Sequence, residues 1–325
     1  MIRNIIFKKN IELMNRACLT SVKPRYIRLQ PNLINFNHYS SNSLKPEYKT
    51  DPNKYLGDKE QINEKGFMDK FKELFYFYKN GIKLIFKNRK EASLLKAKQN
   101  QGEVLTRREF QLIYNSGKDM KKLIPFGLLL LILPESIPFV LVFAPQFVPS
   151  TCITEEQMLK KRKKIQEKRD NITEFALKST RNNQQLLTQK NFTQIENVAN
   201  ALANYHRSFE FNFIQKKALQ GYLKFMGISS FGPLSLLQRR VSQHFDYLKQ
   251  DDQYLIKEGV EGLNEKELIL ALEERGLRTL ELNTTQMKNS LNFWLSAHQL
   301  SNPSPPPIFL ILMNIFRNNV SPQKQ

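Results

Sequence analysis

A single carboxylate, Glu135, lies near the middle of the most apolar stretch of the chain, residues 123–148, with Pro134 before it and Pro138 after it. An ionised carboxylate at the centre of a bilayer costs about 2.5–3.5 kcal/mol on insertion scales, so such a position is usually functional. Pro138 has no N–H to donate and frees the carbonyl of Pro134. The exchange of a proton for a metal cation requires at least a protonatable acid and an oxygen ligand such as this free carbonyl. The alternative is a re-entrant bend at the prolines, with Glu135 reaching the lipid headgroups.

A second set of candidate residues is a run of basic side chains that follows the apolar segment. It comprises Lys160, Lys161, Arg162, Lys163 and Lys164. Consecutive residues point to all sides of a helix, so some of these cations must face solvent. They can bind phosphate, either of lipid headgroups or of ribosomal RNA, and a solvated helix face without a ligand is the alternative. Arg239 and Arg240 are further candidates for contact with RNA or ribosomal protein, with the same alternative.

The apolar segment is long enough to cross a hydrocarbon layer of about 30 Å, because a helix rises about 1.5 Å per residue. We therefore predict one membrane-spanning helix at residues 123–148. Upstream, Phe71, Phe75 and Tyr78 recur at helical spacing between lysines within residues 67–98. Such a helix can lie in a membrane interface or pack on the rest of the protein, and the sequence favours neither alternative.

The first 45 residues are basic, contain Glu12 as their one acid and end in serines. A basic, acid-poor, amphipathic start is typical of a mitochondrial transit peptide. We therefore divide the chain into a transit peptide, a linker with an amphipathic helix, a transmembrane segment, a folded domain and a tail. Their predicted boundaries are residues 1–45, 46–122, 123–148, 149–316 and 317–325.

The net charge of +20 is concentrated on both sides of the apolar segment. Residues 1–122 carry a net charge of +14 and residues 150–190 carry +5, whereas residues 191–325 carry only +2. The flanking excess suggests anionic lipid headgroups or a nucleic-acid surface near a membrane. The C-terminal part looks like an ordinary, nearly neutral globular domain.

From residue 188 onward, apolar side chains recur at helical spacing and no alternating strand pattern is present. We therefore predict an all-α fold. Asn264 with Glu267 makes a capping box for a helix that Gly276 stops, and Thr154 with Gln157 makes another at the start of the basic helix. Further helices are expected within residues 192–202, 211–225, 234–248 and 284–298. The apolar run within residues 303–316 is too short to span a bilayer and is expected to be a docking segment.

The sequence lacks the patterns of common enzymes and metal sites. It has no Gly-rich phosphate loop, no H-E-x-x-H or G-x-S-x-G motif, no metal-ligand spacing of histidines and only two cysteines. We expect no enzyme activity, no catalytic residue, no metal site, no cofactor and no DNA partner. Residues 263–295 are similar to a SAP-type nucleic-acid-binding hairpin, with Arg275, Arg278 and Lys288 as its few phosphate-ready cations. Their nearly balanced charge favours core packing instead.

Three blocks of sequence together resemble the leucine-zipper/EF-hand-containing transmembrane (LETM) proteins of the mitochondrial inner membrane. The first is Leu105-Thr106-Arg107-Arg108-Glu109, ahead of Pro125-Phe126. The second is the apolar segment with Pro138, Pro145 and the exit Pro149-Ser150-Thr151. The third runs from Asp251-Asp252 through Arg275-Gly276-Leu277-Arg278 to Trp294-Leu295. The likeness covers residues 67–316, and the chain is identified as a short member that lacks the EF-hand loop and the C-terminal coiled coils.

The resemblance implies a single-pass protein of the mitochondrial inner membrane, with a helical, 14-3-3-like, ribosome-binding domain in the matrix at residues 149–316. It implies support of potassium/proton exchange and of mitochondrial cation and volume homeostasis. The alternative is a membrane receptor for mitochondrial ribosomes that aids insertion or biogenesis of respiratory-chain proteins, and a scaffold for respiratory complexes without a transport role is a third.

The implied partners are inner-membrane lipid and the mitochondrial ribosome. Because one helix cannot enclose an ion pathway, exchange also requires a homo-oligomer or a partner LETM-family protein. The family usually places a carboxylate four residues before the second proline, whereas Glu135 lies three residues before Pro138.

Overall fold

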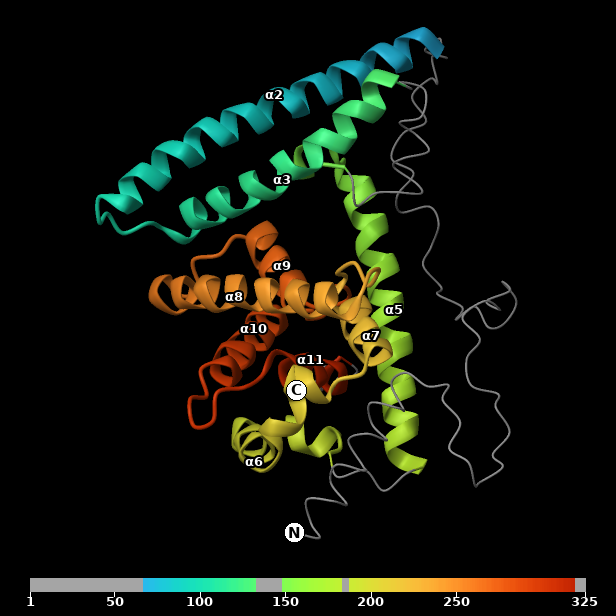
Figure 1. The fold of residues 1–325 in the computed structure, drawn as a ribbon, viewed down its shortest axis with the longest axis vertical. Helices are drawn as coiled ribbons and strands as arrows, with labels where there is room; N and C mark the ends of the chain where they lie inside the picture. The colour runs from blue at the N-terminus through green and yellow to red at the C-terminus, as the bar shows by residue number, and fades with distance from the viewer. Residues whose placement is uncertain (1–66, 133–147, 183–186, 319–325) are drawn as a thin grey trace. The chain divides into compact units, whose positions relative to one another are not determined.

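The computed structural model describes residues 67–132, 148–182 and 187–318, and every regular element within these residues is a helix (Figure 1). The all-α class is therefore confirmed for the described part of the chain. The chain divides into two compact units. The large unit contains Gln101–Gln111 and the described residues from Thr154 onward, and the small unit contains the described residues up to Asn100 together with those of Leu112–Ile153.

The small unit contains α2 (Phe67–Asn100), most of α3 (Arg107–Ile132) and the short 3-10 helix η4 (Ser150–Cys152). Tyr78, Phe126, Val148 and Cys152 form its buried cluster. Gly81 allows η4 to approach α2 closely, because a Cβ at this position would lie 2.7 Å from Cys152 Sγ. The exit sequence after the apolar segment is therefore packed against α2.

The amphipathic helix predicted within residues 67–98 is confirmed as α2, and part of its surface is buried. Tyr78 and Ile85 are almost fully buried, whereas Leu84, Phe86 and Leu94 are 44%, 55% and 60% exposed. The packing alternative therefore holds for one face of α2. The exposed apolar side chains, which alternate with lysines, still fit a membrane interface.

Within the described residues, no helix is both long enough and apolar enough to cross a membrane. Of the segment 123–148, α3 contains the part up to Ile132, with Pro125 inside the helix. Residues 133–147 lie outside the described residues. The single spanning helix therefore stays a prediction.

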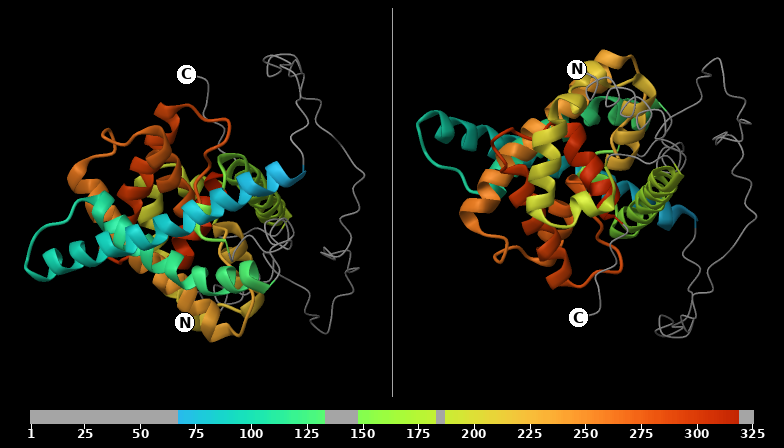
Figure 2. Two further views of the ribbon diagram at one scale, coloured as in Figure 1. Left: turned by 90° about the horizontal axis from the view of Figure 1, so that it is seen from above. Right: turned by 90° about the horizontal axis from the view of Figure 1, so that it is seen from below.

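The large unit is organised around α11 (Pro307–Arg317), in which every residue from Ile308 to Phe316 is buried. A helix that is apolar on all sides must be enclosed by other elements. It packs against α5 (Glu155–Asn182), α7 (Lys216–Met226), α8 (Leu234–Glu258) and the 3-10 helices η5 (Gln189–Phe192) and η6 (His206–Phe209). It lies in the middle of the unit (Figure 2). The apolar run expected to be a docking segment is thus the central core helix.

The other helices of the large unit agree with the periodicity of the sequence. They are α6 (Ile195–Tyr205), α9 (Glu265–Glu274) and α10 (Thr284–His298), with short 3-10 helices η6 (His206–Phe209) and η7 (Phe211–Phe213). The capping box of Asn264 and Glu267 is confirmed at the start of α9. Thr154 and Gln157 also exchange hydrogen bonds, of 3.1 and 3.3 Å, at the start of α5.

Leu312 on α11 provides a test of the core. Its side chain is 1% exposed, so Leu312→Ala leaves a cavity and is expected to lower the free energy of unfolding by about 2–5 kcal/mol. Urea unfolding of the full chain measures this effect. Ile256→Ala on α8 is the control, because Ile256 is 48% exposed and its truncation should cost no more than about 0.5 kcal/mol. Equal destabilisation of both variants would contradict the central position of α11.

Candidate functional site

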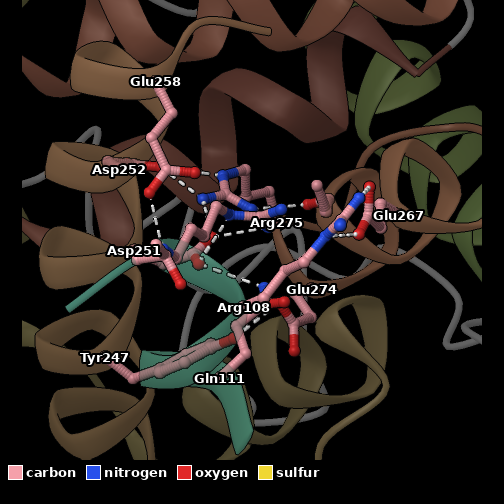
Figure 3. A network of polar contacts seen from close by, with 12 residues as sticks. Arg108, Gln111, Tyr247, Asp251, Asp252, Glu258, Glu267, Glu274 and Arg275 are labelled. Atoms are coloured by element: carbon pink, nitrogen blue, oxygen red, sulfur yellow. Dashed lines mark hydrogen bonds and ion pairs between the residues drawn. The ribbon is translucent and has the colours of Figure 1, made fainter. Parts of the chain in front are cut away.

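Two adjacent aspartates on α8, Asp251 and Asp252, accept hydrogen bonds from side chains in other parts of the large unit (Figure 3). Arg107, at the start of α3, donates to Asp251 from Nε at 2.9 Å and from Nη2 at 3.0 Å. Gln111, one turn later, donates to Asp251 at 3.1 Å. Arg275, directly after α9, adds a donor at 2.7 Å. Asp251 thus accepts four hydrogen bonds, and its side chain is 0% exposed.

Asp252 also has several hydrogen-bonding partners. It accepts from Arg275 Nε at 2.9 Å and from Trp294 Nε1 at 3.0 Å, and His298 Nδ1 lies 2.5 Å from its Oδ2. Burial raises the pKa of the Asp252 carboxyl, but Arg275 and His298 lower that pKa by more, so the net shift is downward. Burial also disfavours the Arg275 cation, and the two aspartates outweigh burial and raise its pKa. Both groups are therefore held in their ionised forms.

We term Arg107, Asp251, Asp252 and Arg275 the aspartate–arginine network. Its two negative and two positive charges compensate, and Arg275 is 0% exposed. A site from which solvent is excluded cannot receive a ligand without rearrangement, so the network is a structural junction. It joins the first turn of α3, α8 and the end of α9, and reaches α10 through Trp294. These residues lie in the blocks of family resemblance, but their spacing in the sequence does not predict that they contact one another.

Arg169 on α5 has an internal role that spacing along the sequence does not predict. Its guanidinium donates to the carbonyl oxygens of Phe225 at 2.9 Å, Leu277 at 3.0 Å and Glu273 at 3.2 Å. Phe225 and Glu273 lie in the last turns of α7 and α9, where free carbonyls and the helix dipole favour a cation. Burial lowers the pKa of Arg169 to about 10, so the side chain stays charged at neutral pH. In the sequence, nothing distinguishes it from the nearby basic run.

The structure places the predicted basic run in the first turns of α5 and divides it by residue type. Lys160, Lys161, Lys163 and Lys164 are exposed, and we term them the α5 lysine surface. Lys160 forms a solvent-exposed ion pair of 2.7 Å with Glu156 one turn earlier. Arg162 is partly buried and forms an ion pair of 2.6 Å with Glu273 on α9. Burial raises the pKa of Glu273, a shift that Arg162 opposes. Arg162 is therefore engaged in packing α5 against α9.

The two arginines on α8 also differ. Arg239 is exposed, whereas Arg240 donates to the carbonyl oxygens of Ser229 at 3.0 Å and Phe231 at 2.5 Å. Arg240 therefore fixes the loop between α7 and α8. Only Arg239 of the pair presents an exposed guanidinium to a partner.

The cations of the SAP-like block are used within the fold. Arg275 belongs to the aspartate–arginine network. Arg278 contacts Asp170 at 3.3 Å and Glu281 at 2.8 Å, and Lys288 forms an ion pair with Glu261. Five of the six apolar residues that would form the core of such a hairpin are buried, and Leu263 is partly buried; the buried ones are Leu268, Leu272, Leu277, Leu291 and Trp294. The core-packing interpretation that the sequence favoured is therefore confirmed for these residues.

The proposed ion pathway of Glu135, Pro134 and Pro138 lies outside the described residues. In the part of the chain that the structure describes, no three His, Cys, Asp or Glu side chains are grouped so that they can hold a metal ion.

A family model described as LETM1-like, RBD matches residues 105–317. The chain belongs to this family. The match begins within the block Leu105-Thr106-Arg107-Arg108-Glu109 and ends at Arg317, the last residue of α11. It therefore includes the whole aspartate–arginine network and the core helix of the large unit. The LETM resemblance of the sequence is confirmed.

Curated relatives of this LETM-family chain are mitochondrial proteins. The LETM1 domain-containing protein YLH47, mitochondrial, of Saccharomyces cerevisiae is 26% identical over 311 residues, which cover 86% of this chain and 68% of the relative. The LETM1 domain-containing protein mdm28, mitochondrial, of Schizosaccharomyces pombe is 24% identical over 73% of this chain and 54% of its own length. The mitochondrial proton/calcium exchanger protein of Drosophila melanogaster is 23% identical over 74% of this chain and 26% of its own length. The chain thus spans about half of the fission-yeast relative and about a quarter of the fly relative.

Asp252→Asn tests the aspartate–arginine network through pH. The pKa of Asp252 is lower in the folded than in the unfolded state, so its stabilising contribution is complete above about pH 4 and is lost as the pH falls through the folded-state value. Removing one partner of a buried ion pair costs about 3–5 kcal/mol, and we expect this destabilisation at pH 7.

Urea unfolding of the full chain between neutral and acid pH measures the effect. The free energy of unfolding of wild type should exceed that of Asp252→Asn by less and less as the pH falls below about 4. Asp246→Asn is the control, because Asp246 lies on the same helix and is exposed. If the difference in free energy of unfolding between wild type and Asp252→Asn does not change with pH, the proposed ionisation of Asp252 is contradicted.

Proposed function

We propose that this LETM-family chain acts at the mitochondrial inner membrane and supports potassium/proton exchange, and thereby cation and volume homeostasis. The observation that carries the proposal is Glu135, the lone carboxylate of the apolar segment, between Pro134 and Pro138. A relative that is named a proton/calcium exchanger supports an exchange role of this kind.

The proposal includes a topology. Residues 1–45 are a transit peptide, residues 123–148 cross the membrane once, and the domain at 149–316 is 14-3-3-like and lies in the matrix. Several copies of the chain, or a second LETM-family protein, enclose the ion pathway. One helix supplies a carboxylate and a carbonyl oxygen but cannot surround a pathway by itself. Protonation of Glu135 then competes with binding of the cation, which couples the two movements.

Glu135→Gln tests this mechanism. Glutamine keeps the shape of the side chain but cannot take up or release a proton at physiological pH. In mitochondria whose only LETM-family protein is this chain, potassium-driven swelling and recovery should fall to the rate measured without the chain. Glu196→Gln on α6, where the carboxylate is exposed, is the matched control and should leave both rates unchanged. Wild-type rates in the Glu135→Gln variant would remove Glu135 from the mechanism.

A second candidate function is a membrane receptor for mitochondrial ribosomes, which the α5 lysine surface favours. Four exposed lysines within five residues offer several charges to phosphates at once. Lysine is a compact and strongly hydrated cation that suits phosphate contact without fixed geometry. This function does not depend on Glu135, so the two proposals are tested separately.

A Lys163→Ala/Lys164→Ala variant tests the receptor function. At low salt it should co-sediment less with mitochondrial ribosomes than the full wild-type chain. The slope of log affinity against log salt should become shallower by about 0.7–0.9 for each phosphate that the variant no longer neutralises. Lys249→Ala/Lys257→Ala, which removes two exposed lysines of α8, is the control and should bind like wild type. Failure of the wild-type chain to co-sediment even at low salt would exclude the receptor function.

A further inference from the structure

The loop between α7 and α8 comprises residues 227–233 (Figure 1). It presents a large apolar side chain to solvent. Phe231 is 86% exposed, and Leu234 and Leu236 in the first turn of α8 are each 36% exposed. We term these three side chains the loop patch. Single exposed apolar residues are common on protein surfaces, but three within one loop and the adjoining turn form a surface that a partner can bury.

The loop is held in place by side chains of both flanking helices. Arg240 on α8 donates to the carbonyl oxygens of Ser229 and Phe231, and Gln220 Nε2 on α7 donates to that of Ser230 at 3.0 Å. Gly232 follows Phe231 with a φ of +127°, which a side chain would strain. The exposed position of Phe231 is therefore built into the loop, and binding does not require the loop to be ordered first.

The helix–loop–helix segment that contains the loop patch is basic. Residues 214–240 contain five basic side chains and no acidic one, although residues 191–325 as a whole carry a net charge of only +2. Four of the five are exposed: Lys216, Lys217, Lys224 and Arg239. The charge of this helix–loop–helix segment therefore favours an anionic partner.

An exposed aromatic ring in a basic segment fits unpaired nucleotides or an anionic bilayer. Bases stack on aromatic rings, but two of the three side chains in the loop patch are leucines, which have no π-face. Leucine and phenylalanine both enter the boundary between headgroups and acyl chains, while lysine and arginine remain at the headgroups. We propose that the loop patch inserts into the interface of an anionic bilayer. This membrane contact belongs to the large unit and depends neither on the predicted span nor on either proposed function.

A fluorescent reporter beside Phe231 tests the proposal in the full chain. Ser229→Cys in a Cys18→Ser background accepts an environment-sensitive fluorophore, because Ser229 is exposed, its bond to Arg240 uses the carbonyl oxygen, and Cys152 is 0% exposed. The emission should shift to the blue with vesicles of phosphatidylcholine and phosphatidylglycerol, and less with phosphatidylcholine alone. Adding Phe231→Ser should abolish the shift without lowering the melting temperature, and Arg239→Gln should weaken it.

The same fluorophore at Asn292→Cys on α10, an exposed position outside the loop patch, is the control and should not shift. Flotation of the vesicles after alkaline extraction measures separately whether the predicted membrane-spanning helix holds the chain in the bilayer. A chain that floats with the vesicles while the Ser229 reporter stays unshifted would overturn the loop proposal and leave the span intact. A shift with ribosomal RNA but not with vesicles would also overturn it and assign the loop to nucleic acid.

Discussion

The large unit depends on the burial of two positive and two negative charges beside its apolar core. Arg275 has no solvent exposure and donates to Asp251, to Asp252 and, at 2.7 Å, to the carbonyl oxygen of Ala271. Removing such groups from water is costly, and the cost is offset only where geometry satisfies nearly every donor and acceptor. The aspartate–arginine network meets this condition with groups from three separate stretches of chain. The positions of these stretches are therefore coupled, and a shift in one exposes charges in the others.

Within the described residues, the buried basic side chains are all arginines, although other arginines such as Arg239 are exposed. Arg107, Arg169 and Arg275 are buried and donate to carboxylates or carbonyl oxygens, and Arg162 and Arg240 are also used within the fold. The lysines of the basic run remain outside. The guanidinium is planar, carries five donors and is more weakly hydrated than an ammonium, which suits it to fixed internal contacts. The surface available to lipid or RNA is consequently smaller and richer in lysine than the composition suggests.

The proposed functions and the proposed membrane contact use different parts of the chain. The proposed exchange depends on Glu135, whereas the α5 lysine surface and the loop patch belong to the large unit and offer charge and apolar side chains to other partners. A domain with several anchoring surfaces can hold a partner close to a bilayer, because each further contact acts at a high effective concentration. The rigidity that the aspartate–arginine network gives to the large unit would keep such surfaces in fixed relation to one another.

The family, the all-α class of the described residues and the ends of several helices are readable from the amino-acid sequence alone. The signals for these features are local: apolar spacing along one helix face, and the capping box of Asn264 and Glu267. The tertiary structure decided which polar residues are internal. Arg162 and Lys163 are neighbours in one basic run, and only the position of Glu273 on α9 separates an ion pair from an exposed cation. The length of the apolar run of α11 predicts a docking segment, and its enclosure by the other helices of the large unit makes this run the core. Such outcomes depend on contacts between residues far apart in the chain, which spacing along one helix does not encode.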